Sequence, residues 1–265
     1  MGGVYLAAHA LTGERVALKV LDSQFANYPE VVARLFAEQD LASRARHPAL
    51  VEIRAAHRSA DDVPYLVMEY LVGDTLGAVA ERAPLEIPAI VSICAQLAAA
   101  LAALHDAGVM HCDVKHDNVF VLEETGAHGV PRVKLIDFGV SRRVDEVHVE
   151  DAAIAGTPWC MAPEQWRGQP STASDVYALG CLLYDLITGV PPFDGSLPEL
   201  MLKHLEQRPA RPSWLAKVPG DLERLILRAL AKDAAHRPAM AELARDLTAM
   251  ADRHVATVDE LRAAG

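Results

Sequence analysis

Apolar, β-favouring runs dominate the first part of the chain. The runs "GVYLAAHA" and "RVALKVL" are joined by the turn "LTGE" and predict a β-hairpin. Two later runs, "LVEIRAAHR" and "PYLVMEYL", flank the turn at Asp61 and Asp62 and predict two more strands. Between these pairs, "PEVVARLFAEQDLASRA" has apolar residues at the spacing of one helix face. The pattern predicts a strand-rich unit with one helix.

The pattern changes at "VGDTLG", where the composition shifts toward alanine and leucine, and a boundary is expected near Leu71 to Gly73. Beyond it, Pro88 can open a long helix that Gly108 ends as a left-handed cap. The runs "VFVL" and "RVKLID" predict a hairpin, and "SDVYALGCLLYDLITG" predicts a buried helix capped by Ser174. Two amphipathic helices, "DLERLILRALA" and "MAELARDLTAMADRHV", complete a mainly helical second part.

Composition narrows the function classes only moderately. The chain has 265 residues, enough for one large domain or two lobes, and with 51% hydrophobic residues it is not disordered. A formal net charge of −11 argues against a nucleic-acid binder, which needs a basic face. No apolar run was expected to reach the length of a membrane span. The scattered cysteines favour a reducing, cytoplasmic location, and they are Cys94, Cys112, Cys160 and Cys181.

Charged residues crowd into "VMHCDVKHDNVFVL", between two apolar stretches. Within it, Asp113 can accept a hydroxyl proton and Lys115 can neutralise a phosphoryl group in transfer. Asn118 and Asp137, the latter at the end of the strand "KLID", offer oxygen ligands that suit Mg²⁺. Phosphoryl transfer needs mainly positioning and charge neutralisation, and these residues supply both.

Other candidate signals are weak alone. Lys19 ends the strand motif "VALK" and Glu38 sits in mid-helix, and both residue types usually face solvent at such positions. The 11 histidines form no HExxH or comparable ligand set, so a zinc site is not expected. Lys19 and Glu38 gain meaning only in combination with the later motifs.

In this combination the chain resembles the eukaryotic-type serine/threonine protein kinases of bacteria. The resemblance covers nearly the whole chain, and its motifs occur in the order and at the spacing of that family. They are "VALK" at 16–19, "HCDVKHDN" at 111–118, "DFG" at 137–139, "GTPWCMAPE" at 156–164, "SDVYALG" at 174–180 and "HRP" at 236–238. The resemblance implies an α+β, bilobal kinase fold. Residues 1–71 would form the small β-rich lobe with one regulatory helix, and residues 72–265 the larger, mainly helical lobe.

The resemblance also implies roles for individual residues. Asp113 would orient and deprotonate the substrate hydroxyl, Lys115 would assist at the γ-phosphate, and Asn118 and Asp137 would hold Mg²⁺. The residues expected to bind ATP are Gly2, Val4, Ala17, Lys19, Glu38, Met68, Glu69, Leu71 and Phe120. Within this set, Lys19 would pair with Glu38, and the backbones of Glu69 and Leu71 would bond the base. Lys115 together with Thr157 fits the serine/threonine class, so the expected partners are proteins with serine or threonine hydroxyls.

The resemblance implies a scaffold as well as a site. Glu164 and Arg237 match a buried ion pair of the family's large lobe, and Asp175 matches the helix acid that braces the catalytic loop. These three residues are expected to support the site without taking part in chemistry.

The chain departs from the family pattern in two places. The Gly-rich strand–turn–strand is represented only by Gly2, Gly3 and Val4, which predicts an N-terminally truncated record. The alternative is a kinase with an incomplete phosphate lid. Second, Cys112 stands where the family usually has the arginine of HRD, which receives an activation-loop phosphate.

The stretch "RRVDEVHVEDAAIAG" agrees with this second departure, because it has no serine, threonine or tyrosine. We therefore hypothesise that phosphorylation of this stretch does not switch activity. Cys112 as a redox handle is the weaker interpretation, since buried cysteines are usually inert.

Three functions follow as alternatives. The first is a Mg²⁺–ATP-dependent serine/threonine protein kinase, and the complete set of charged motif residues favours it. The second is a pseudokinase that binds a nucleotide or a partner as a scaffold, favoured by the short glycine loop. A small-molecule phosphotransferase is disfavoured because "GTPWCMAPE" resembles a peptide-docking segment. The sequence does not predict the protein substrate or the oligomeric state.

Overall fold

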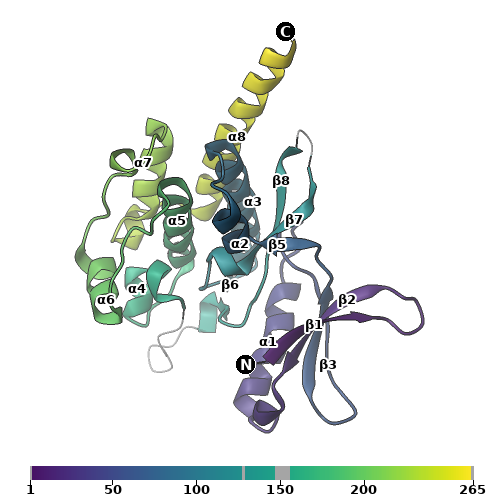
Figure 1. Cartoon of the computed structure of the whole chain (residues 1–265). Coiled ribbons are helices and arrows are strands. Elements are labelled where there is room, and N and C mark those ends of the chain that lie inside the picture. The colour runs from purple at the N-terminus through teal and green to yellow at the C-terminus, as the bar shows by residue number, and fades with distance from the viewer. Residues whose placement is uncertain (1, 127–128, 147–155, 264–265) are drawn as a thin grey trace.

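The computed structural model describes residues 2–126, 129–146 and 156–263. It has a β-sheet part at the N-terminus and a helical part that makes up most of the chain (Figure 1). The expected α+β class, with a β-rich part followed by a mainly helical part, is confirmed. Residues 147–155, which make up most of the stretch without hydroxyl side chains, lie outside the described residues.

The N-terminal part is a four-stranded antiparallel sheet with one long helix packed on it. The strand order is β1-β2-β4-β3, so β1 is at one edge. The strands are β1 (Gly2–Ala8), β2 (Arg15–Leu21), β3 (Ile53–Arg58) and β4 (Pro64–Glu69). Helix α1 (Pro29–Ser43) follows the short 3-10 helix η1 (Ser23–Phe25) and packs on β3 and β4. Both hairpins expected in this part are present.

Short strands connect this sheet to the helical part. Strand β5 (Gly73–Thr75) pairs with β7 (Val119–Thr125), which pairs in turn with β8 (Pro131–Leu135). The β7–β8 pair is the third hairpin that the sequence predicted. Two further strands of two residues each, β6 (Val109–Met110) and β9 (Arg142–Arg143), pair with one another. The segments that carry the charged motifs lie between them in the sequence.

Two apolar helices form the centre of the helical part. Most residues of α5 (Thr172–Thr188) are buried, and α3 (Ile87–Asp106) packs against α5, α8 and β8. The other helices are α2 (Leu76–Arg82), α4 (Pro163–Trp166), α6 (Leu197–Glu206), α7 (Gly220–Ala229) and α8 (Met240–Ala263). The later 3-10 helices are η2 (His116–Asn118), η4 (Val144–Glu146), η6 (Pro158–Cys160), η7 (Pro212–Trp214) and η8 (Ala234–His236).

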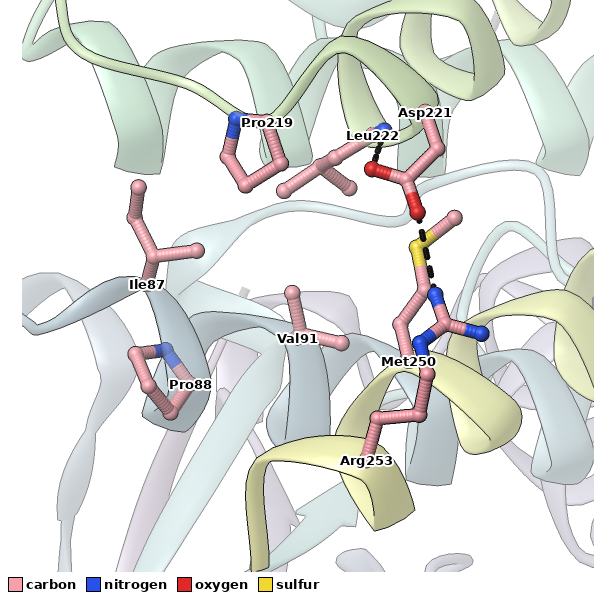
Figure 2. Close-up of a pocket in the computed structure, with 8 residues that line it drawn as sticks. All are labelled: Ile87, Pro88, Val91, Pro219, Asp221, Leu222, Met250 and Arg253. Atoms are coloured by element: carbon pink, nitrogen blue, oxygen red, sulfur yellow. Dashed lines mark hydrogen bonds and ion pairs between the residues drawn. The ribbon is translucent and has the colours of Figure 1, made fainter. Parts of the chain in front are cut away.

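The start of α3 meets α7 and α8 around a small apolar cavity of about 170 Å³. Figure 2 shows Val91 and Met250 on its wall and the ion pair between Asp221 and Arg253, 3.0 Å apart, at its edge. The cavity marks where the C-terminal helix α8 closes over the core.

Two sequence expectations about these helices were wrong. Helix α3, with 20 residues and a mean hydropathy of 2.1, is long and apolar enough to cross a membrane, contrary to the expectation that no run reaches that length. Over half of its most apolar window is buried inside the fold, as in the core helix of a globular domain. The cap of α5 is Ser171 rather than Ser174, because Ser174 sits one turn in and closes a capping box with Ser171.

Candidate active site

Lys19 and Glu38 come from different elements of the N-terminal part. Lys19 lies on β2 opposite Val4 of β1, and Glu38 lies on the buried face of α1 together with Leu35 and Leu41. The Lys19 Nζ is 2.9 Å from Glu38 Oε1 and 2.7 Å from Oε2. The structure thus joins the two residues whose pairing the sequence implied.

Asp137 reaches the same lysine from the helical part, with its Oδ1 2.8 Å from Lys19 Nζ. Its backbone has a φ of 68°, in the left-handed region that non-glycine residues seldom adopt. The backbone N–H of Gly139 donates to Asp137 Oδ1 over 3.1 Å. A Cβ on Gly139 would approach Asp137 Oδ1 to 3.1 Å and Glu38 Oε1 to 3.2 Å, so glycine leaves room for both acids.

Burial and charge compete at this cluster. Burial disfavours the ammonium of Lys19, but the charges and hydrogen bonds of Glu38 and Asp137 outweigh it and raise the lysine pKa. Burial likewise opposes ionisation of Asp137, but Lys19 outweighs it and the Asp137 pKa is lowered. At Glu38 burial wins over the attraction of Lys19, and its pKa is raised. Lys19 is therefore a stable cation between two acids, of which Asp137 is the firmer anion.

Asp113 and Lys115 lie close to Thr157 on the other side of the site. Thr157 Oγ1 donates to Asp113 Oδ1 over 2.6 Å, and Lys115 Nζ donates to Thr157 Oγ1 over 2.9 Å. Lys115 Nζ is also 2.8 Å from Asp113 Oδ2. Burial would lower the Lys115 pKa, but Asp113 outweighs it and the pKa is raised. An acid, an ammonium and a hydroxyl therefore meet at one point.

Asn118 is oriented by Asp113. Its amide Nδ2 donates to the backbone carbonyl of Asp113 over 2.8 Å and to the Oδ2 carboxylate oxygen over 3.0 Å. These bonds use both amide hydrogens and leave the amide oxygen of Asn118 as the atom that can bind a cation. The donor set of Asn118 and Asp137 consists of hard oxygens, which fits Mg²⁺. The described residues contain no group of three His, Cys, Asp or Glu side chains that could hold a metal. A Mg²⁺ ion bound by Asn118 and Asp137 would therefore also need oxygen atoms from a bound ligand.

A fully buried acid of α5 supports the loop that carries Asp113. Asp175 Oδ2 accepts the backbone N–H of His111 over 2.9 Å, and Oδ1 accepts that of Cys112 over 2.8 Å. The His105 Nε2 is 2.8 Å from the same carboxylate. Burial opposes ionisation of Asp175, but His105 and the backbone donors outweigh it, and its pKa is lowered. This is the bracing position that the resemblance implied.

Cys112 is held in an unusual conformation between these donors. Its φ is 65° and its backbone carbonyl accepts Gln165 Nε2 over 3.0 Å. Burial raises the pKa of the Cys112 thiol well above its ordinary value, so the group stays protonated at neutral pH. A buried, protonated thiol agrees with the inert interpretation of this cysteine.

A cavity of about 430 Å³ opens between the N-terminal sheet and the helical part. Its wall includes ten residues named from the sequence, namely Val4, Ala17, Lys19, Glu38, Met68, Glu69, Leu71, Asn118, Phe120 and Asp137. Gly2, Asp113 and Lys115 are outside its wall. The structure therefore gathers most of the expected nucleotide and metal residues around one space.

The cavity wall also contains residues that the sequence reasoning missed. They are Tyr5, Leu6, Val51, Ile53, Tyr70, Asp117 and Ile136. Ile136 carried a signal, because it directly precedes Asp137 in the strand motif. Val51 and Ile53 carried none, since Val51 is placed by a backbone bond to Leu135 and Ile53 by the pairing of β3 with β4.

The segment that follows residue 155 is anchored in the helical part. Arg237 Nη1 donates to Glu164 Oε1 over 2.6 Å and Nη2 donates to Oε2 over 2.9 Å. The pair is nearly inaccessible, with the Arg237 side chain fully buried. This ion pair was the expected scaffold, and it fixes the end of the segment that contains Thr157.

The family follows from comparison with known proteins. Residues 1–247 match the protein kinase domain. The chain belongs to the protein kinase domain family. This kinase domain is 40% identical over 237 residues to serine/threonine-protein kinase Pkn1 of Myxococcus xanthus, covering 88% of the chain and 34% of that protein.

Two further relatives are similar over most of the domain. The domain is 35% identical to serine/threonine-protein kinase PrkC of Bacillus subtilis, covering 91% of the chain and 37% of PrkC. It is 36% identical to serine/threonine-protein kinase PknB of Mycobacterium leprae, covering 93% of the chain and 40% of PknB. The chain thus spans less than half the length of these curated relatives. The resemblance to bacterial serine/threonine kinases is confirmed at the level of the family.

Proposed function

We propose that this kinase domain transfers the γ-phosphate of Mg²⁺–ATP to serine or threonine hydroxyls of proteins. The observation that carries the proposal is the three-way contact of Lys19 with Glu38 and Asp137 at the wall of the cavity. It is supported by relatives that are named serine/threonine-protein kinases.

In this proposal the cavity holds ATP. Val4, Ala17, Met68 and Phe120 supply its apolar faces, and the Glu69 and Leu71 backbones bond the base. Lys19 binds the phosphates, since two neighbouring carboxylates keep it charged. Gly2 is the first residue of β1, and its expected role at the phosphates stays a prediction. Asn118 and Asp137 hold Mg²⁺, which neutralises phosphate charge when it is bound.

The transfer step is assigned to Asp113 and Lys115. Asp113 accepts a hydrogen bond from Thr157 Oγ1 at 2.6 Å, so its carboxylate can accept one from a substrate hydroxyl of the same kind. Asp113 would orient that hydroxyl and take its proton, while Lys115 offsets negative charge at the transferred phosphoryl group. Lys115 already contacts both Asp113 and Thr157, so no large rearrangement is required.

The proposal includes the division into lobes and the setting of the enzyme. Residues 1–71 would form the small lobe and residues 72–265 the large lobe, in keeping with β5, which starts at Gly73 and pairs with β7 of the helical part. A reducing cytoplasm is in keeping with the four cysteines, which are all unpaired thiols. Proteins with serine or threonine are the proposed partners, and the low content of basic residues still argues against nucleic acid.

We also propose that the peptide-docking segment is ordered without a phosphate. Gln165 joins the Cys112 carbonyl to the backbone N–H of Ala162, and Thr157 bonds Asp113. These hydrogen bonds, which need no phosphate, act where other kinases use an arginine and a phosphate. Phosphopeptide mapping after autophosphorylation, with alanine variants of every mapped site, tests this idea. A phosphate on Ser141 or Thr157, the hydroxyl residues that border 142–156, whose removal by a phosphatase abolishes transfer would contradict it.

The deciding experiment measures γ-phosphate transfer from ³²P-labelled ATP to a generic basic protein. Transfer by the wild type and its loss by at least about 10³-fold in Asp113→Asn, with Mg²⁺–ATP affinity retained, is the expected outcome. Asp194→Asn, a change at an exposed acid, is the control and should retain full transfer. Mg²⁺-dependent ATP binding without transfer by the wild type would favour the pseudokinase alternative.

A further inference from the structure

His116 connects two segments of the proposed site by ring packing. Its imidazole stacks on the indole of Trp159, with ring centroids 5.1 Å apart and an interplanar angle of 28°. His116 belongs to η2, directly after Lys115, and Trp159 belongs to η6, two residues after Thr157. The stack is therefore a second link between segments that Thr157 already joins to Asp113 and Lys115.

A third element fixes the orientation of the imidazole. His116 Nε2 is 3.2 Å from Asp185 Oδ2 of the core helix α5, and both side chains are mostly buried. Helix α2 packs on η2, and a Cβ at Gly77 would lie 3.5 Å from the Cβ of His116. A ring held by a carboxylate on its edge and packed near the backbone has little freedom to leave Trp159.

The cluster of His116, Trp159 and Asp185 is separate from the nucleotide cavity. None of the three lines that cavity, although the neighbouring Asp117 does. His116 instead contacts Trp159, which belongs to the segment 157–161 that the sequence analysis matched to peptide docking. Loss of the stack should therefore disturb peptide placement and leave nucleotide binding intact.

We propose that His116 is a positioning residue for the peptide substrate, acting through Trp159. The stack and the Asp185 contact set the height and tilt of η6, and with them the place at which an acceptor hydroxyl meets Asp113. Asp185 holds the ring, and Trp159 forms the part of the docking surface that the ring supports. The inference deepens the proposed kinase function and rests on it.

Sequence context supports a role particular to this chain. The position of His116 is one that the resemblance associates with variable residues or with proline, and proline has neither an aromatic ring nor a hydrogen-bond donor. The stack on Trp159 contributes a modest free energy beyond the area that it buries, and the contact with Asp185 adds to it. Together they support a change of about 10-fold in the peptide parameters.

The test compares His116→Ala, His116→Phe, Trp159→Ala and the double variant His116→Ala/Trp159→Ala. The substrate is a library of synthetic peptides, each with one central threonine among randomised residues. In His116→Ala we expect kcat/KM for peptide to fall about 10-fold, mainly through KM, while KM for ATP changes less than about two-fold. His116→Phe keeps the stack and should recover most of the loss. The double variant should be no worse than the weaker single variant, because both remove the same contact.

The matched control is His57→Ala. His57 also packs on an aromatic ring, that of Tyr65 with centroids 6.0 Å apart, but it lies in the N-terminal sheet outside the cavity wall. This change should leave both KM values as they are in the wild type. It separates the loss of an imidazole–aromatic contact in general from the loss at η6.

Amide hydrogen exchange gives a readout that does not need catalysis. Exchange in 157–161 should rise in His116→Ala and Trp159→Ala but not in His57→Ala or His116→Phe. Unchanged exchange, equal rises in both KM values, independent losses in the double variant, or a His116→Phe as weak as His116→Ala would each overturn the inference. A wild type that phosphorylates no peptide or protein would instead refute the proposed function, and the exchange result alone would then decide the role of His116.

Discussion

The two sides of the proposed site are held together by different forces. On the nucleotide side, one ammonium pairs with two carboxylates, and the side chains of Lys19 and Asp137 are 27% and 45% exposed. On the peptide side, hydrogen bonds and ring packing, as between Thr157 and Asp113 or His116 and Trp159, accompany one ion pair, that of Lys115 with Asp113. The nucleotide side also joins two parts of the chain, whereas the peptide side is built within the helical part alone.

This difference has a physical consequence. Ion pairs that are partly exposed contribute little to stability but respond strongly to a charged ligand, because the ligand can replace one partner. Hydrogen bonds and ring contacts inside one packed unit depend less on ligand charge and instead define a fixed shape. We therefore expect changes on the nucleotide side to affect chemistry more than folding, and changes beneath the peptide side to affect both.

The largest effect is expected for Lys19→Met. The variant removes the cation that Glu38 and Asp137 share, and kcat/KM for ATP should fall about 10²–10³-fold, or about 3–4 kcal/mol. Because the methionine keeps the aliphatic stem, the free energy of unfolding should change by less than about 1 kcal/mol. Lys203→Met, at a partly exposed lysine paired with Asp194, is the control with no expected effect on transfer. Loss of stability that matches the loss of activity would contradict the contrast between the two sides.

Asp175→Asn tests the support beneath the peptide side. The carboxylate accepts bonds from His111, Cys112 and His105 at zero exposure, and an amide cannot accept with both ends. The free energy of unfolding should fall by about 3 kcal/mol, measured by urea denaturation. Transfer should fall as well, because the loop of Asp113 loses its bracing. Full stability with reduced transfer would show that Asp175 acts only on chemistry. It would contradict the expectation that changes beneath the peptide side affect both folding and chemistry.

A pH effect is expected from His204, which contacts the backbone of the segment that contains Trp159. Burial and the charge of Lys232 lower the His204 pKa to about 4, although the Trp159 backbone favours the protonated form. The unfolded chain, with an ordinary pKa near 6.5, binds the proton more readily. Stability therefore falls as the pH drops from about 6.5 to about 4, by about 3 kcal/mol from this group.

The variant His204→Gln should flatten this part of the pH profile of unfolding. Peptide KM should rise in the wild type over the same interval, with a smaller change in KM for ATP, because His204 contacts the η6 backbone. A matched variant is His57→Gln, at an exposed histidine, which should keep the wild-type profile. An unchanged slope in His204→Gln would contradict the assignment.

The fold and the nucleotide side were largely predictable from the sequence. Hairpins and apolar helices have local signatures, and Lys19, Asp113 and Asp137 lie in motifs with fixed spacing. Their meeting in space was implied by the resemblance and not by the spacing. Helix α3 reaches the length of a membrane span because alanines continue the apolar run between its larger apolar side chains.

The peptide side was far less predictable. Gln165 contacts Cys112 across 53 positions of sequence, and His116 meets Trp159 through packing that no local pattern reports. Cys112 and Asp137 adopt positive φ angles that their residue types disfavour, so tertiary contacts impose them. Such long-range, residue-specific contacts have no local signature, and only the folded chain reveals them.

The smallest effect is expected at Thr157. Thr157 donates to Asp113 and accepts from Lys115, so Thr157→Val removes both bonds at nearly constant volume. Transfer to peptide should fall about 10-fold, equal to about 1.4 kcal/mol, with KM for ATP unchanged. Thr157→Ser keeps the hydroxyl and should lose less than about two-fold. If Thr157→Ser lost transfer while Thr157→Val kept it, the methyl group of Thr157 and not its hydroxyl would be what the site requires, and the hydrogen bonds of Thr157 would not matter for transfer.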